Sequence, residues 1–241
     1  TTITSEAAGY PKENLSDYRP YTQWKPTTTA TQNIRFDILA GSVTVNSFYI
    51  LEHDLGTQTA TVTITSTTNA DYVTGAVTHL TKAFTTNDDY WIDFTGDASR
   101  YWQIAITLMD AVCKVGEIFL GAKYTLPVLP PDGFDPDAQE TFMQVERSLG
   151  GNMVGSVVTH TDRVIQIQQK YVTEAQAQTF KDFWEDHASI GKPFGFVPDE
   201  GNYATSFYFV VMDNAPKLSM PTESLYRHFS FTARGVRRTK W

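Results

Sequence analysis

The segment Ile34-Arg35-Phe36-Asp37-Ile38 decides the fold of the first half of this chain. Its apolar residues Ile34, Phe36 and Ile38 alternate with charged ones. In an extended strand the three apolar side chains would share one face, while Arg35 and Asp37 would share the other. A period of two residues is typical of a strand that buries one side. The segment therefore predicts a β-strand with a buried and a solvated face.

The same strand character recurs in five further segments of the first half, which are separated by turn-rich stretches without a helical pattern. The predicted strands are Val43 to Leu51, Thr61 to Thr65, Tyr90 to Phe94, Tyr101 to Leu108 and Val115 to Leu120. Short strands with turns every ~8–15 residues are typical of an antiparallel sandwich. We therefore expect a mainly β chain in which residues 1–124 form one antiparallel β-sandwich.

A proline-rich stretch follows this predicted sandwich. Between Pro127 and Pro136, four of ten residues are proline. Proline cannot donate the hydrogen bond that a central strand needs, and it favours an extended connection. We therefore predict a linker at 125–138 and a second domain at 139–241.

The second domain is predicted to be β-rich. Its strand-like segments are Phe142 to Arg147, Val164 to Val172, Phe194 to Val197, Phe207 to Val211 and Tyr226 to Ala233. Gly150 and Gly151 lie between the first two of these segments, where they favour a turn or a bulge.

One amphipathic helix is predicted at about residues 173–188. Thr173 can cap its first turn, and Gln176 three residues later completes a capping-box pattern. Gly191 and Pro193 would end the helix. Its expected apolar stripe consists of Ala177, Phe180, Trp184 and His187.

The charge distribution bears on the partners of this chain. A formal net charge of −8 argues against nucleic-acid binding, because phosphate contacts need clustered Lys and Arg. One basic cluster does occur, at Arg234, Arg237, Arg238 and Lys240. It is either a solvated strand end with its tail or an arm that contacts acidic surface on an adjacent subunit. We predict the subunit contact.

Cysteine content and targeting signals bear on the compartment of synthesis. Cys113 is the single cysteine, so no intrachain disulfide can form, which suits synthesis in a reducing cytosol. The first residues show neither the basic nor the apolar region of a signal peptide. No apolar run approaches the ~18 residues that a membrane helix needs. We expect a soluble cytoplasmic product.

No pattern for nucleophilic or acid–base catalysis is present, so we expect no catalytic residue and no enzyme activity. The chain has no Gly-x-Ser-x-Gly sequence, and its five histidines occur singly. Adjacent acids such as Asp88 and Asp89 would point to opposite faces of a strand, which does not suit a glycosidase pair. A hydrolase formed from distant acids is the least favoured hypothesis.

We also expect no cofactor and no metal from the motifs. Three acids occur between Asp132 and Asp137, but they lack EF-hand spacing and a proline interrupts them. The glycines between Gly150 and Gly155 match no nucleotide-binding pattern.

A family resemblance begins in the segment from Asn14 to Lys25, NLSDYRPYTQWK. With the strand at Ile34 and the segment Val45 to Leu55, it resembles a galactose-binding-like (discoidin-type) β-sandwich of jelly-roll form, over roughly residues 10–124. The resemblance implies that Asn14 and Asp17 would lie near a cation. Alternatively, Asp17 is a turn acceptor and Trp24 a core residue.

The second half more loosely resembles distal-tail and minor tail proteins of tailed phages. The likeness rests on Gly150-Gly151, Phe183-Trp184 and the segment Gly191-Lys192-Pro193-Phe194. It implies a structural subunit of a virion tail tip or baseplate, made in the host cytoplasm. Copies would form a six-fold or three-fold ring that joins the tail tube to hub or receptor-binding proteins.

An alternative hypothesis is a carbohydrate-binding adhesion module. It would use aromatic side chains exposed in loops, such as Tyr18, Tyr21 or Tyr203. Neither hypothesis requires catalysis, a cofactor or membrane insertion.

Overall fold

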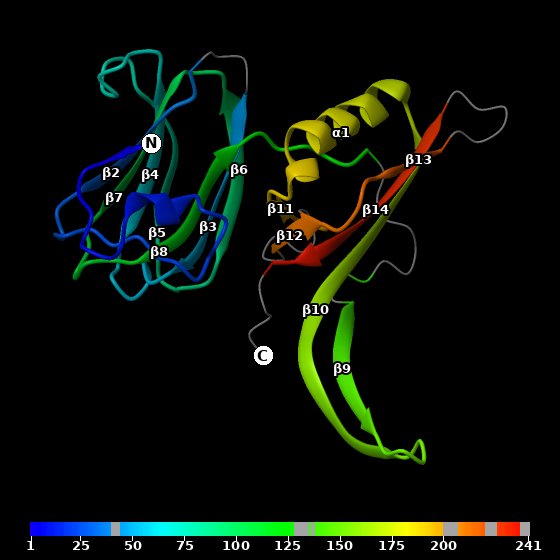
Figure 1. Ribbon diagram of the computed structural model, residues 1–241. Coiled ribbons are helices and arrows are strands. Elements are labelled where there is room, and N and C mark those ends of the chain that lie inside the picture. Colours follow the sequence, from blue (N-terminus) through cyan, green and yellow to red (C-terminus); the bar gives the residue numbers. More distant parts are fainter. Residues whose placement is uncertain (40–43, 128–134, 136–137, 200–206, 220–225, 237–241) are drawn as a thin grey trace. The chain divides into compact units, whose positions relative to one another are not determined.

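The computed structural model describes all residues except 40–43, 128–134, 136–137, 200–206, 220–225 and 237–241. The chain divides into two compact units, Thr1–Tyr124 and Thr125–Trp241 (Figure 1). Both are mainly β with antiparallel pairing, as predicted. Most of the proline-rich linker lies outside the described residues. Within the described part of the chain, no helix has the length and apolar character needed to cross a bilayer.

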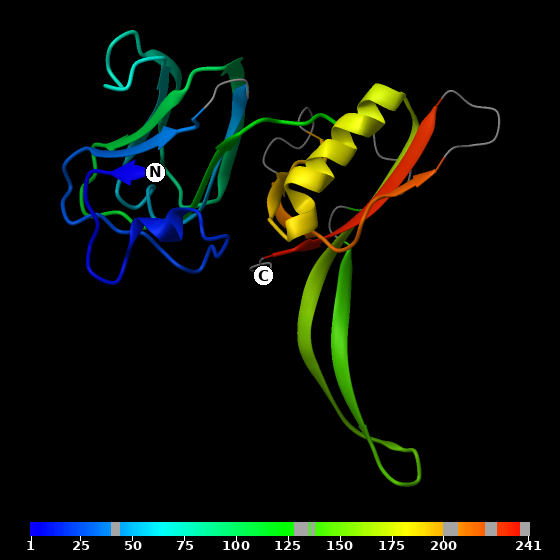
Figure 2. The same cartoon turned by 45° about the horizontal axis from the view of Figure 1, so that its top comes forward.

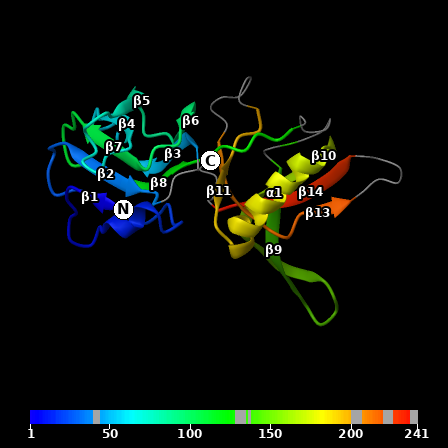
Figure 3. The ribbon, with the colours of Figure 1, turned by 90° about the horizontal axis from the view of Figure 1, so that it is seen from above.

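Unit 1 is a sandwich of two antiparallel sheets. Its strands are β1 (Thr2–Ile3), β2 (Gln32–Asp37), β3 (Val45–His53), β4 (Thr61–Thr67), β5 (Val77–Ala83), β6 (Tyr90–Asp97), β7 (Tyr101–Thr107) and β8 (Val115–Gly121), and η1 (Lys12–Leu15) is a 3₁₀ turn. One sheet has the order β1-β2-β7-β4-β5, and the other has the order β6-β3-β8 (Figure 3). This confirms the predicted β-sandwich.

The core of unit 1 follows the alternation that predicted its strands. Ile34 of β2 is fully buried, and so are Trp102 and Ile104 on neighbouring β7. They share one cluster with Phe48 and Ile50 of β3, in the opposite sheet. Full burial of such a side chain contributes about 1.5–3 kcal/mol, so this cluster is what holds the two sheets together.

The sequence did not predict strand β5. Its residues Val77, Thr78 and Thr81 are exposed, and it pairs with β4 as the end strand of its sheet. An edge strand that buries little apolar surface has only a weak alternating pattern. Backbone hydrogen bonds with β4, rather than a buried apolar face, hold β5 in the sheet.

Unit 2 contains an antiparallel sheet whose strands differ widely in length, together with helix α1. Its elements are β9 (Gln139–Arg147), β10 (Met153–Val172), α1 (Glu174–Asp186), η2 (Ala188–Ile190), β11 (Phe194–Phe196), β12 (Tyr208–Met212), β13 (Lys217–Ser219) and β14 (Arg227–Gly235). The sheet order is β11-β12-β14-β10-β9, with β13 pairing to β14.

Helix α1 begins with the predicted capping box. The Thr173 hydroxyl accepts from the Gln176 backbone N–H, and the Gln176 side chain accepts from the Thr173 N–H. The helix lies along one face of the sheet (Figure 3), where the Phe180 ring stacks on Phe229 at 4.4 Å and on Phe231 at 5.1 Å. These rings anchor α1 to β14.

The apolar face of α1 differs from the predicted stripe. Ala177 and Phe180 are buried as expected, whereas Trp184 is only half-buried. Phe183, which the stripe omitted, packs edge-on against Phe194 at 5.2 Å and stacks on His187. The buried side of the helix therefore includes Phe183 in addition to the predicted residues.

Strand β10 is longer than predicted. Residues 153–163 pair with β9, and residues 164–172 pair with β14. The added part mixes Gly155, several hydroxyls and charges, and therefore shows no continuous buried face. The β9–β10 hairpin extends beyond the other strands of its own sheet (Figures 1 and 2). Gly151, with φ +81°, permits its tight turn.

Candidate functional site

The β9–β10 hairpin carries apolar side chains on one face. The antiparallel register places Met143 opposite Val158. Val145 and Arg147 follow on the same face of β9 at intervals of two residues, and Met153 lies opposite Arg147. Cross-strand partners share a face, so these four apolar side chains lie on one face of the hairpin, together with Arg147 and with Ser156, which is opposite Val145. We call it the apolar face; its members are Met143, Val145, Met153 and Val158.

This apolar face is exposed. Its four side chains have exposed fractions between 40% and 63%. A two-stranded hairpin is marginal in water without further packing, and a contiguous exposed apolar patch commonly marks a contact surface. The geometry suits contact with another polypeptide.

The opposite face of the hairpin is more polar. Glu140 lies opposite Asp162, and Gln144 lies opposite Val157, which is 67% exposed. Glu146 follows on the same side of β9, since it lies two residues beyond Gln144. Phe142 lies on this side as well, opposite His160, so the two faces differ in degree. Among the described residues, no element of its own unit covers the apolar face.

The hairpin also has open backbone edges. Strand β9 stands at the end of the sheet order, and residues 153–163 of β10 pair with β9 alone within the described chain. Unpaired N–H and C=O groups along such an edge can accept a strand from another molecule. Both backbone and side chains thus favour association here.

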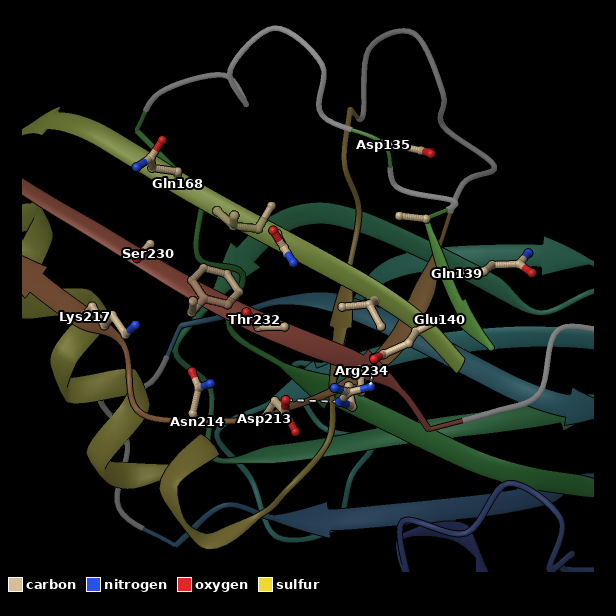
Figure 4. A pocket seen from close by; sticks show the side chains of 15 residues that line it. Asp135, Gln139, Glu140, Gln168, Asp213, Asn214, Lys217, Ser230, Thr232 and Arg234 are labelled. Atoms are coloured by element: carbon tan, nitrogen blue, oxygen red, sulfur yellow. Dashed lines mark hydrogen bonds and ion pairs between the residues drawn. The ribbon is translucent and has the colours of Figure 1, made fainter. Parts of the chain in front are cut away.

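Arg234 lies at the base of the hairpin. Its guanidinium is 2.8 Å from Glu140, 3.1 Å from Asp213 and 4.0 Å from Asp162 (Figure 4). Hydrogen bonds to Glu140 and Asp213 raise the pKa of Arg234. The predicted contact of Arg234 with another subunit stays a prediction, since these ion pairs all lie within unit 2.

The rest of the predicted basic contact cannot be placed. Arg237, Arg238 and Lys240 lie outside the described residues. Their contact with another subunit also stays a prediction.

A polar hollow of about 870 Å³ lies on the side of the sheet opposite α1 (Figure 4). Gln168, Ser230, Thr232 and Lys217 line it together with Arg234. Three acids line it: Glu140 and Asp213 are engaged by Arg234, and the third is Asp135; among the described residues, no histidine lines it. The hollow offers solvated hydrogen-bonding groups rather than a constellation for catalysis.

Unit 1 contains a second candidate site, in the segment between η1 and Trp24. Trp24 is fully buried, and its backbone pairs with Val115 of β8. Asn14 donates from its side chain to the Gln23 carbonyl at 2.8 Å. A Cβ added at Gly116 would lie 2.4 Å from the Pro20 carbonyl oxygen, so glycine permits the segment to approach β8.

Two carboxylates meet in this segment. The Arg19 backbone N–H donates to Asp17 at 2.9 Å and to Glu117 of β8 at 2.7 Å. The other Asp17 oxygen accepts from the Thr22 hydroxyl at 2.8 Å. Glu117 is fully buried, and its Oε2 atom has no hydrogen-bond partner. The structure thus holds two acids together with one unsatisfied oxygen.

Burial, together with a hydrogen bond to the neighbouring Asp17 carboxylate, raises the pKa of Glu117 to about 8. A divalent cation would relieve this cost, because it pairs with both carboxylates and prefers oxygen ligands. Asp17 and Glu117 could hold such an ion, which would then tie the segment before β2 to β8. No group of three or more His, Cys, Asp or Glu side chains suited to a metal occurs among the described residues, so other oxygens would complete the shell.

The family resemblance implied Asn14 and Asp17 as residues near a cation. Asp17 does lie beside the buried acid, whereas Asn14 uses its amide nitrogen to hold the backbone. Sequence reasoning missed Glu117. Its signal was a single acid inside the apolar strand Val115–Gly121, where an ionisable residue needs a reason to be buried.

Ser66, His79 and Asp97 also meet, which the sequence did not predict. The Ser66 hydroxyl donates to Asp97, and His79 Nε2 lies 2.8 Å from the same hydroxyl oxygen. In a catalytic triad the histidine uses its two nitrogens to bridge serine and acid. Here Nε2 faces both groups, and it lies 3.7 Å from Asp97. Ser66 is 1% exposed, so the cluster locks β4, β5 and β6 together.

The single cysteine is not a reactive thiol. Cys113 is fully buried, and burial raises its pKa to about 12. A thiol that stays protonated at neutral pH is a poor nucleophile. Cys113 is therefore a small core residue, as the sequence suggested.

Comparison with known proteins gives matches for the sandwich. No family model matches the chain, and no curated protein matches it. Similar solved structures include chitosan-binding module 1 of a chitosanase/glucanase from Paenibacillus sp. IK-5, with 20% identity, 50% of this chain and 92% of that one covered, and a TM-score of 0.43. Another is the CBM32 of AlyQ in complex with 4,5-unsaturated mannuronic acid, with 20% identity, coverages of 51% and 93%, and a TM-score of 0.41.

A third similar structure is CBM32-3 from a family 31 glycoside hydrolase of Clostridium perfringens. It shares 16% identity, covers 51% of this chain and 89% of its own, and has a TM-score of 0.41. The three are carbohydrate-binding modules rather than phage tail proteins, and they correspond to the β-sandwich part of this chain.

Proposed function

We propose that the protein is a subunit of a larger assembly and that the β9–β10 hairpin joins it to a neighbouring copy. The observation that carries this proposal is the apolar face of the hairpin, whose four side chains are 40% to 63% exposed. In unit 1 the same alternating pattern buries Trp102, Ile104 and Ile106 of β7 completely. A second chain would supply the missing cover.

The free energy gained by burying the apolar face, set against the cost of association, favours an assembly of several copies over a pair. Full burial of one Val or Met side chain contributes about 1.5–3 kcal/mol, so four contribute at most ~6–12 kcal/mol. Association costs an estimated ~4–15 kcal/mol in lost freedom. The apolar face alone therefore gives a weak pair. A closed ring, in which every copy makes two such contacts, would be much more stable.

The narrower form of this proposal is a ring in the tip of a phage tail. A hairpin on one side of a subunit that docks on a different surface of the next makes a head-to-tail contact, and such contacts form a ring when the rotation between copies closes. The ring would be six-fold or three-fold and would join tube, hub and receptor-binding proteins. Its support is the sequence resemblance of the second half. Mass spectrometry of purified virions tests it, because a tail subunit must be present in the particle.

The hairpin contact is tested with two serine variants of the full chain. Val158→Ser and Val157→Ser remove the same side chain from opposite faces of β10, and both residues are more than half exposed. We expect Val158→Ser to reduce association in sedimentation experiments and Val157→Ser to leave it unchanged. Equal association of wild type and both variants, in solution and in the particle, would contradict the proposal.

A second function is carbohydrate binding by unit 1. It is favoured by the galactose-binding-like sandwich together with aromatic side chains in the segment before β2. Tyr21 is 78% exposed, and half-buried Tyr18 stacks on Phe119 at 5.7 Å. Tyr203 lies outside the described residues. A glycan array probed with the full chain, with and without calcium, tests this function; absence of binding in both conditions would contradict it.

We further propose that the chain is not an enzyme. Its candidate nucleophiles, Cys113 and Ser66, are both buried. Neither an active-site serine probe nor a thiol probe should label the folded protein. Stoichiometric labelling of either residue in the folded state would refute this view.

A further inference from the structure

Arg35 lies on the outer face of the larger sheet of unit 1. Its neighbour Ile34 is fully buried on the core side, whereas Arg35 is half-buried on the other. The register places Thr2 of β1 and Gln103 of β7 beside it, and Thr65 of β4 lies beyond Gln103. One arginine thus stands in a row of short polar side chains.

The guanidinium of Arg35 is held in one orientation. Its Nε donates to the Gln103 side-chain oxygen at 2.7 Å. The guanidinium carbon lies 4.9 Å from the centre of the Tyr72 ring, within the range of a cation–π contact. No carboxylate of the described residues makes an ion pair with Arg35. The N–H groups of its two terminal nitrogens can therefore donate to a ligand.

Arg100 provides a contrast within the same patch. Its Nε and Nη2 donate to the two carboxylate oxygens of Asp37, at 2.7 and 2.9 Å. It lies 4.9 Å above the Tyr101 ring, and Tyr101 in turn meets Tyr72 edge-on at 5.4 Å. The two arginines thus flank a pair of tyrosines, and only the charge of Arg100 is compensated.

The loop between β4 and β5 holds Tyr72 in a strained conformation. Tyr72 has φ +62°, a left-handed value that costs a non-glycine residue free energy. The Asp71 carboxylate accepts from the Val73 and Thr74 backbone N–H groups. Thr67 and Asn69 both donate to the Thr74 carbonyl. These bonds keep the Tyr72 ring against Arg35.

We propose that this patch binds the carboxylate of an acidic oligosaccharide through the terminal nitrogens of Arg35. Here the patch is defined by Arg35, Tyr72 and the hydroxyls of Thr2 and Thr65. A guanidinium presents two parallel N–H donors that match the two oxygens of a carboxylate. In Arg35 the Nε atom is bonded to Gln103 and one face is stacked on Tyr72, so the edge with the two terminal nitrogens is the part that a ligand can reach.

The surroundings select the class of ligand. Arg35 supplies one positive charge and Asp37 lies nearby, so a singly charged carboxylate meets less repulsion than a doubly charged phosphate. The hydroxyls of Thr2 and Thr65 can exchange hydrogen bonds with sugar hydroxyls in the same row. A uronic-acid oligomer combines both groups. This inference rests on the second proposed function, carbohydrate binding by unit 1.

Calorimetric titration of the full chain compares oligogalacturonate with its methyl-esterified, uncharged form of equal length. We expect the acid form to bind more tightly. Arg35→Lys keeps the charge but loses the paired donors, and it should weaken binding of the acid form ~10-fold or more. The double variant Asp37→Asn/Arg100→Gln removes the neighbouring ion pair without changing the net charge, and it is the matched control; it should bind nearly as wild type.

The outcomes separate this inference from the function on which it rests. If both forms bind equally and Arg35→Lys has no effect, carbohydrate binding stands and the inference is overturned. If neither form binds, and no neutral glycan binds either, both are overturned. Equal weakening by Arg35→Lys and by the Asp37→Asn/Arg100→Gln variant would show that binding does not depend on the paired donors of Arg35, and would also overturn it. Thermal melting of each variant establishes that it is folded.

Discussion

The sandwich of unit 1 and the hairpin of unit 2 use the same alternating pattern with opposite results. Along β7, Trp102, Ile104 and Ile106 are all fully buried, because a second sheet packs over them. Along β9 and β10, Met143 and Val158 are each 54% exposed. Alternation therefore shows that a strand has an apolar face, but it does not show which molecule covers that face.

The largest effect should come from a core side chain of the sandwich. Trp102→Ala leaves a cavity between the two sheets, and we expect it to lower the free energy of unfolding by ~3–5 kcal/mol. The matched change on the hairpin, Val158→Ala, should alter the stability of the monomer by less than ~0.5 kcal/mol. Chemical denaturation of both variants at low protein concentration measures the difference. Similar losses would mean that the hairpin is packed within its own chain.

Helix α1 of unit 2 carries a buried aromatic residue, Phe180, and a half-buried one, Trp184. Phe180→Ala removes the ring that stacks on Phe229 and Phe231, and it should cost ~3–5 kcal/mol. Trp184→Ala should cost less, about 1–2 kcal/mol, because Trp184 is only half-buried. Thermal melting of the two variants compares them. A larger loss for Trp184→Ala would contradict the observed orientation of the helix.

Glu117 should make the stability of the sandwich depend on pH. Its folded pKa is raised to about 8, above the ordinary value of 4.5, so the folded state holds the proton more tightly. This contribution is fully present below about pH 4.5 and is lost as the pH rises through about 8. We expect Glu117→Gln to flatten the decline in melting temperature between pH 5 and pH 9. An unchanged decline would show that another group titrates.

Calcium offers a sharper test of the same pair. At pH 8, calcium should raise the melting temperature of the wild type, because an ion that binds only the folded state stabilises it. The melting temperatures of Glu117→Gln and Asp17→Asn should rise less with calcium than that of the wild type. Glu52→Gln, which changes an acid on β3, serves as the control and should respond as the wild type does. Equal shifts in all four proteins would exclude an ion at Asp17 and Glu117.

The smallest effect should come from the base of the hairpin. Arg234→Met removes the ion pairs with Glu140 and Asp213, which are partly exposed and contribute ~1 kcal/mol or less in total. We expect a small change in the melting temperature but faster amide hydrogen exchange in residues 139–147. Unchanged exchange there would show that Arg234 does not hold the hairpin.

Much of the local structure was predictable. The strands of the sandwich core follow from period-two alternation, and the start of α1 follows from Thr173 and Gln176. The prediction missed β5, the extension of β10 and the packing of Phe183. These segments bury little apolar surface or owe their place to a neighbouring element. Periodicity within the segment therefore could not identify them.

The candidate sites divide in the same way. The sequence by itself determined the strands of the sandwich core, the cap of α1, the burial of Trp24 and the presence of a single core thiol, because these depend on contacts within a few residues or on simple alternation. The tertiary structure alone decided that Glu117 meets Asp17, that Tyr72 stacks on Arg35 and that the apolar face of the hairpin lies uncovered by its own unit. Such pairs are distant in the chain, and strand order and register bring them together.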